Sequence, residues 1–156
     1  MSRDIDAERV RTWIDDDLVG SVERVPDEAA EFNLAVEISN LLLHVVRRDP
    51  EGPLLVGQQI EYGADIRSRI QEMAEADRND LVARIRETLT GVPVVYGFHD
   101  ERGANVRFAE LSRIFIEHRL YPDAASQQTL MEGLVAVWKA MRYLDDIVTL
   151  VDSVER

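Results

Sequence analysis

Three histidines are the residues best suited to acid–base chemistry or metal binding in this sequence. His44 is surrounded by leucines and valines, His99 precedes the turn sequence DERG, and His118 follows Glu117. A zinc site needs ligands at helical or hairpin spacing, as in H-E-x-x-H, and these histidines do not have that spacing. Cysteine ligands and cysteine nucleophiles are excluded because the sequence has no cysteine. We therefore predict that all three histidines are structural or surface residues.

Adjacent carboxylates occur at two places, in the run from Asp15 to Asp17 and at Asp145 and Asp146. Neighbouring side chains on a helix diverge by about 100°, so these carboxylates do not converge on one ion, and EF-hand spacing is absent. No spacing singles out a catalytic pair among the 30 acidic residues. The sequence also lacks G-x-S-x-G, the P-loop and G-x-G-x-x-G. We predict a protein that is not an enzyme, has no metal or cofactor, and carries solvated acidic surface at both runs.

Two of the eight glycines stand inside expected elements. Gly57, in the sequence LLVGQQIEY, indicates a bulge in a strand. Gly133 lies inside an expected helix, where glycine costs about 1 kcal/mol relative to alanine. Close approach of another backbone would explain Gly133, and simple tolerance of glycine explains it equally well.

The charge composition is strongly acidic. Asp and Glu total 30 against 18 Lys and Arg, which gives a net charge of -12, and Lys139 is the sole lysine. Dense carboxylates with few lysines are typical of proteins that work in molar salt, where self-repulsion is screened. A genome rich in G and C would also favour arginine over lysine. Nucleic-acid binding is disfavoured under either explanation, because it needs a basic face.

Length and hydropathy favour one domain over residues 1–156. The N-terminal sequence MSRDIDAERV has no apolar signal core, and no run approaches 18 apolar residues. We therefore expect a cytoplasmic protein that does not bind membranes.

Five segments are predicted to be strands. Apolar and polar residues alternate with period two over 30–38, and 40–48 and 53–62 follow as the second and third strands. The turn sequence DPEGP, and a link as short as Ser39-Asn40, make hairpins of these three. The remaining strands are 92–98 and 106–120, separated by HDERGAN.

Helical periodicity covers the rest of the chain. A first helix is expected over Asp4–Asp17 with Asp4 or Asp6 as its N-cap. Residues 64–90 form two consecutive helices or one long kinked helix ended by Gly91. A terminal helix runs from 123 to about 154, with Asp123 as its predicted N-cap. The order α-β-β-β-α-β-β-α predicts an α+β fold, with a mostly antiparallel five-stranded sheet and helices packed on one face.

This element order, the acidity, and the long C-terminal helix LMEGLVAVWKAMRYLDDIVTLV together resemble the type III secretion chaperone-like fold. That fold is shared by bacterial secretion chaperones, YbjN-type proteins and an uncharacterised archaeal family. The resemblance spans nearly the whole chain and rests on no residue motif. It implies a small acidic homodimer that binds another polypeptide and performs no chemistry. Service to a secretion apparatus does not follow from fold alone.

The C-terminal stretch carries an apolar stripe with heptad spacing and a wider flank. The stripe is predicted to pack in the core and consists of Leu130, Leu134, Val137, Met141, Leu144, Val148 and Val151. Met131, Trp138 and Ile147 widen the apolar face and are predicted, with Trp13 on the first helix, to contact a protein partner or a second copy of the chain. Core packing is the competing interpretation for both tryptophans.

Three classes of function remain open from the sequence. A polypeptide-binding or chaperone-like protein is the leading hypothesis, with an extended partner segment lying against the sheet or in a helix groove. The second is a small-ligand-binding or enzymatic domain with a pocket between sheet and helices. The third is a structural subunit of a larger assembly.

Overall fold

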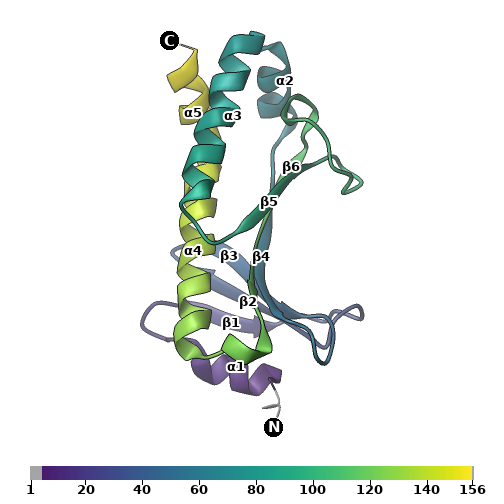
Figure 1. The fold of residues 1–156 in the computed structure, drawn as a ribbon, viewed down its shortest axis with the longest axis vertical. Helices are drawn as coiled ribbons and strands as arrows, with labels where there is room; N and C mark the ends of the chain where they lie inside the picture. The colour runs from purple at the N-terminus through teal and green to yellow at the C-terminus, as the bar shows by residue number, and fades with distance from the viewer. Residues whose placement is uncertain (1–4, 156) are drawn as a thin grey trace.

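The computed structural model describes residues 5–155 and shows an α+β fold (Figure 1). The elements of this part of the chain are α1 (Ala7–Trp13), β1 (Ser21–Arg24), β2 (Phe32–Ile38), β3 (Leu41–Arg47), β4 (Leu54–Glu61), α2 (Ala64–Glu72), α3 (Glu75–Thr90), β5 (Val95–His99), the 3-10 turn η1 (Phe108–Glu110), β6 (Arg113–Leu120), the 3-10 turn η2 (Pro122–Ala124), α4 (Gln127–Asp145) and α5 (Ile147–Val154).

The strands form one antiparallel sheet in the order β1-β2-β3-β4-β6-β5. The predicted hairpins are confirmed. Ser39 and Asn40 both have positive φ, at 45° and 68°. A two-residue type I′ hairpin turn, whose twist matches that of the strands, requires positive φ at both positions. Six strands are present in the described chain rather than the predicted five. The missed strand, β1, is a four-residue edge strand with three exposed residues, so its sequence has no apolar alternation.

The predicted bulge at Gly57 is wrong. The pairing of β4 with β6 is regular from Leu54 opposite Leu120 to Glu61 opposite Arg113. Glycine is needed there because a Cβ would come within 2.6 Å of the carbonyl oxygen of Ile116. Another backbone therefore approaches closely at Gly57, whereas the nearest atoms to a Cβ at Gly133 belong to a side chain.

Helices α1, α3, α4 and α5 lie on one side of the sheet, as predicted (Figure 1). Helix α4 packs across β3, β4 and β6, α1 lies against β2 and α4, and α3 lies against α4 and α5. Of the two alternatives for residues 64–90, the structure has the two consecutive helices, because Met73 and Ala74 have extended backbone between α2 and α3. Helix α1 is shorter than expected. Asp6 caps it by accepting a hydrogen bond from the Arg9 amide, and Asp4 lies outside the described residues.

The start of the terminal helix differs from the prediction. Asp123 lies in η2 and does not cap α4. Ser126 is the N-cap, and with Thr129 it makes a reciprocal capping box. The predicted cap, Asp123, is wrong because the 3-10 turn at Pro122–Ala124 comes first and the helix starts three residues later, after Ser126.

The end of the terminal helix also differs, because the helix breaks at Asp146. The break turns Val148 outward, to 44% exposure, and buries Ile147 at 3%. The other six members of the predicted stripe are buried, as expected for core residues. The hydroxyl of Tyr62 donates a 3.0 Å hydrogen bond to the carbonyl of Leu144 and so satisfies a terminal carbonyl of α4.

Candidate functional site

The face of the sheet opposite the helices is uncovered by any α-helix of the described chain (Figure 1). Strand alternation places the buried apolar residues toward the helices and their neighbours toward this open face. The register aligns four side-chain positions across it, because Ala35 pairs with His44, His44 with Gly57, and Gly57 with Glu117. His44 and Glu117 therefore face outward on either side of a glycine.

The open face is hollowed around Gly57. The hollow has a volume of about 480 Å³, and its walls come from β2, β3, β4, β5 and β6. Val46, Leu55 and Phe115 supply apolar surface, and His44 and Glu117 supply hydrogen-bonding groups. The missing side chain at Gly57 leaves space between two strands that carry long side chains, so the glycine required by the backbone contact with Ile116 also shapes the hollow.

His44 is held by a chain of hydrogen bonds at one side of the hollow. Its Nδ1 lies 2.9 Å from Oδ1 of Asn33, and Nδ2 of Asn33 donates to Oδ2 of Asp27 at 3.1 Å. Because the Asn33 oxygen faces the ring, Nδ1 carries the proton and Nε2 is the acceptor nitrogen of the neutral ring. Burial lowers the pKa of His44, and the nearby charge of Asp27 opposes this shift. The neutral ring is thus favoured, with a lone pair on Nε2.

Glu117 lies at the other side of the hollow and is mostly covered. Its side chain is 17% exposed, and its Oε2 accepts a 2.8 Å hydrogen bond from Nε of Arg119. Oε1 is the carboxylate oxygen left for another donor. Arg119 and Arg48 line the hollow on the Leu55 side, so cationic groups lie at one end and Glu117 with His44 lies nearer Gly57.

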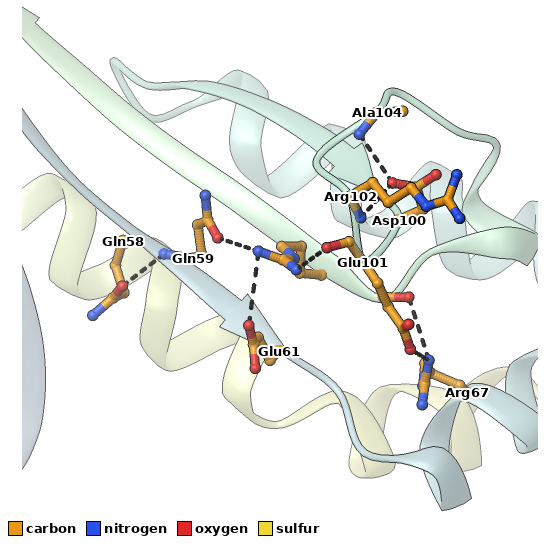
Figure 2. Close-up of polar contacts among 10 residues, drawn as sticks. Gln58, Gln59, Glu61, Arg67, Asp100, Glu101, Arg102 and Ala104 are labelled. Carbon is orange, nitrogen blue, oxygen red and sulfur yellow. Dashed lines mark hydrogen bonds and ion pairs between the residues drawn. The ribbon is translucent and has the colours of Figure 1, made fainter. Parts of the chain in front are cut away.

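A polar cluster borders the hollow where β6 begins. Figure 2 shows Gln59, Glu61 and Glu101 converging on one guanidinium, which belongs to Arg113. The carboxylate of Glu101 also accepts a 2.9 Å bond from Arg67 of α2. The cluster therefore fastens the loop after β5 to both the sheet and α2.

The same loop is ordered by Asp100, whose carboxylate accepts hydrogen bonds from two backbone amides (Figure 2). These bonds, first from Ala104 and then from Arg102, lower the pKa of Asp100. The ring of His99 stacks on Phe115 with centroids 4.7 Å apart. The wall of the hollow on this side is thus held by both polar and aromatic contacts.

The three histidines lie in separate environments. His44 contacts Asn33, His99 stacks on Phe115, and Nδ1 of His118 lies 2.6 Å from the carbonyl oxygen of Pro93. Within residues 5–155, no group of three or more His, Cys, Asp or Glu residues is placed to hold a metal ion.

Two of the predicted contact residues lie on the exposed side of α4. Met131 lines a surface hollow of about 430 Å³ between α4 and the segment Gly91–Pro93. Trp138 lines a second, of about 400 Å³, and Lys139 borders both. Both side chains are half-buried and pack against the core, and the indole Nε1 of Trp138 is buried without a hydrogen-bond partner in the described chain.

The other two predicted contact residues lie elsewhere. Ile147 is buried in the core, because the break at Asp146 rotates it inward, and it is not available to a partner on this surface. Trp13 is half-buried at the end of α1, beneath the guanidinium of Arg9 at 5.6 Å. Its carbonyl accepts a bond from Gln127 at the start of α4. Trp13 therefore lies apart from the α4 flank.

The hollow on the open face was not predicted from the sequence. The strand alternation did indicate which residues face it. The chain neighbours of His44 and Glu117 include core residues, so the two side chains must point to the opposite face of the sheet. Gly57 stands at the same kind of position in β4. The register that aligns them joins strands about 60 residues apart, and the sequence does not specify that register.

Residues 6–148 match the family described as "Uncharacterized conserved protein (DUF2299)". The chain belongs to this family. The match includes every residue that lines the open-face hollow and both half-buried residues of α4. Among curated proteins, the DUF2299 chain has no match.

The fold of this DUF2299 protein is similar to a solved structure, the crystal structure of an uncharacterized protein from Methanothermobacter thermautotrophicus. The TM-score is 0.72, the sequence identity is 18%, and the likeness covers 94% of this chain and 96% of that one. At this identity the similarity establishes a shared fold. No helix in the described part of the DUF2299 chain is both long and apolar enough to span a membrane.

Proposed function

We propose that this protein binds a segment of another polypeptide on the open face of its sheet and performs no chemistry itself. The observation that carries the proposal is the hollow of about 480 Å³ on a sheet face that no α-helix of the described chain covers. The resemblance to the type III secretion chaperone-like fold supports the same class of function and remains a prediction.

The form of the hollow suits an extended chain. From β2 through β3 and β4 to β6 there are three strand spacings of about 4.8 Å, or about 14 Å in all, which is the length of roughly four extended residues. Apolar floor at Val46, Leu55 and Phe115 alternates with hydrogen-bonding groups on His44 and Glu117. A polypeptide offers both kinds of group, with side chains for the floor and main-chain amides for the acceptors.

The net charge of the protein favours a bound polypeptide segment that is basic. With a net charge of -12, the protein attracts a basic partner and repels an acidic one, and in molar salt this preference acts at contact distance because the Debye length is about 3 Å. The partner we propose therefore carries apolar and basic side chains.

A second surface fits another copy of the chain. Along the exposed side of α4, Glu132 precedes Val135 and Lys139, and Arg142 follows them. In an antiparallel pairing of the exposed sides of two α4 helices, with the two-fold axis at the level of residue 137 along the helix, Glu132 would face Arg142 of the other copy and Met131 would face Tyr143. This self-complementarity supports the proposal of a homodimer through α4, which leaves both open faces free.

The cellular setting is part of the same proposal. The excess of 30 acidic over 18 basic residues supports a protein of a salt-rich cytoplasm, where surface repulsion is screened.

The experiment is a peptide array probed with the purified protein in molar potassium chloride. Acetylated twelve-residue peptides that bind the wild type should lose binding to Leu55→Asp, which places a charge on the apolar floor of the hollow. The matched control is Val148→Asp, at an exposed apolar residue on the helical side. Equal binding by Leu55→Asp and wild type, or no binding by any peptide, would contradict the proposal.

A further inference from the structure

Hydrogen-bond acceptors lie on both sides of Gly57 in the hollow, one on His44 and one on Glu117. Gly57 pairs with His44 on one strand and with Glu117 on the other, so the two outward side chains start about 10 Å apart, or two strand spacings. Both side chains line the hollow beside Gly57, which has no side chain of its own.

The free acceptors at this point are defined by the bonds already made. Asn33 uses the proton on Nδ1 of His44, so Nε2 of the neutral ring presents a lone pair. Arg119 uses Oε2 of Glu117, so Oε1 presents the remaining carboxylate oxygen. Neither acceptor can serve a ligand that brings only acceptors, such as a phosphate or a carboxylate.

We infer that the hollow over Gly57 takes a lysine side chain of the bound polypeptide, with its ammonium group between Nε2 of His44 and Oε1 of Glu117. This inference rests on the proposed function and names the side chain that the site recognises. An ammonium group has three donors, which suit the imidazole, the carboxylate and one water molecule. The aliphatic part of the lysine lies on the apolar floor at Leu55 and Phe115.

The position of the lysine within the segment is also restricted. Arg48 and Arg119 border the hollow on the Leu55 side, where a second cation would be repelled. Arg119 bonds Oε2 of Glu117 and leaves Oε1 as an acceptor, and the chain Asp27–Asn33–His44 keeps the opposite ring oriented. A cation is therefore favoured over Gly57 and disfavoured over Leu55, two residues away in β4.

The test uses the tightest peptide from the array, together with copies in which each lysine in turn is replaced by norleucine. Norleucine keeps the aliphatic chain and removes the ammonium group. We expect one such replacement to weaken binding about tenfold, as loss of a charge-assisted hydrogen bond does. In Glu117→Gln the lysine and norleucine peptides should bind about equally. Glu61→Gln is the control. Glu61 lies on the same face of the sheet as Glu117, is 72% exposed and is outside the hollow.

The outcomes separate the two proposals. Peptides that bind on the hollow with no dependence on any lysine, or a lysine dependence unchanged in Glu117→Gln, would overturn this inference and leave polypeptide binding standing. An array without any binding peptide would overturn polypeptide binding itself.

Discussion

The imidazole of His118 occupies the space in which a side chain at Gly133 would stand. A Cβ on Gly133 would lie 2.5 Å from Cδ2 of that ring, and the ring's Nδ1 is held by the carbonyl of Pro93. Helix α4 therefore approaches β6 through a histidine fitted against a glycine. This contact explains a glycine inside a helix, which the sequence left open between tolerance and a close backbone.

Gly133→Ala tests this contact. In most helix interiors the change stabilises, but here the new methyl group overlaps the ring, and we expect a loss of about 1–3 kcal/mol in the free energy of unfolding. Denaturant unfolding of Gly133→Ala, His118→Ala and the double variant gives the coupling energy. The alanine should be tolerated better in the His118→Ala background; equal effects in both backgrounds would show that the ring is not the obstacle.

Tyr62→Phe tests the tie between β4 and the end of α4. The variant leaves the Leu144 carbonyl without the 3.0 Å bond and should cost about 1–2 kcal/mol of stability. Amide hydrogen exchange should rise in α5, which begins just after this tie. Unchanged exchange in α5 would show that the hydroxyl does not support the helix break.

The pH dependence of stability tests the environment of His44. Burial lowers its pKa in the folded state, so the unfolded chain binds the proton more readily. The contribution of neutral His44 is present above the unfolded pKa of about 6.5 and is lost as pH falls through the folded pKa. Wild type should therefore lose stability on acidification from neutral pH more steeply than His44→Gln, measured by chemical unfolding at each pH. Parallel curves would contradict a depressed pKa.

A charge swap tests the proposed pairing of two α4 helices. Glu132→Arg and Arg142→Glu each place like charges opposite one another and should raise the dimer dissociation constant several-fold, while the double variant restores opposite charges. Sedimentation at matched salt measures the constant. Arg86→Glu, on an exposed position of α3, is the control. A monomeric wild type, or a double variant whose dissociation constant is as high as those of the single variants, would contradict the proposed pairing.

Salt dependence tests the proposed cellular setting. With a net charge of -12, the folded protein should gain thermal stability from dilute to molar potassium chloride, as self-repulsion is screened. Each of the five ion pairs among the described residues has at least one exposed partner, so these pairs would lose strength instead. A melting temperature that is flat or falls over this range would argue against adaptation to high salt.

Period-two alternation and turn chemistry were enough to place β2, β3 and β4 and their hairpins, because each strand buries one face and Ser39-Asn40 suits a tight turn. They did not find β1, whose residues Ser21–Arg24 are mostly exposed and are ordered by pairing with β2. The helix break at Asp146 could not be predicted from the sequence, because the heptad spacing of apolar residues continues through it.

The predicted contact residues show the same limit. Met131 and Trp138 were located correctly on the side of α4 beside its buried stripe, since helical spacing alone fixes that side. Ile147 was misplaced because its side depends on the break. The open-face hollow depends on pairing Gly57 with Glu117, a contact that local sequence does not determine.

Amide chemical-shift mapping of an array-selected peptide on the labelled protein tests the central claim most directly. Binding to the open face predicts that the largest shifts cluster at Val46, Leu55, Gly57 and Phe115 and are absent from the exposed side of α4. Shifts confined to α4 around Met131 and Trp138, with the sheet unchanged, would contradict it.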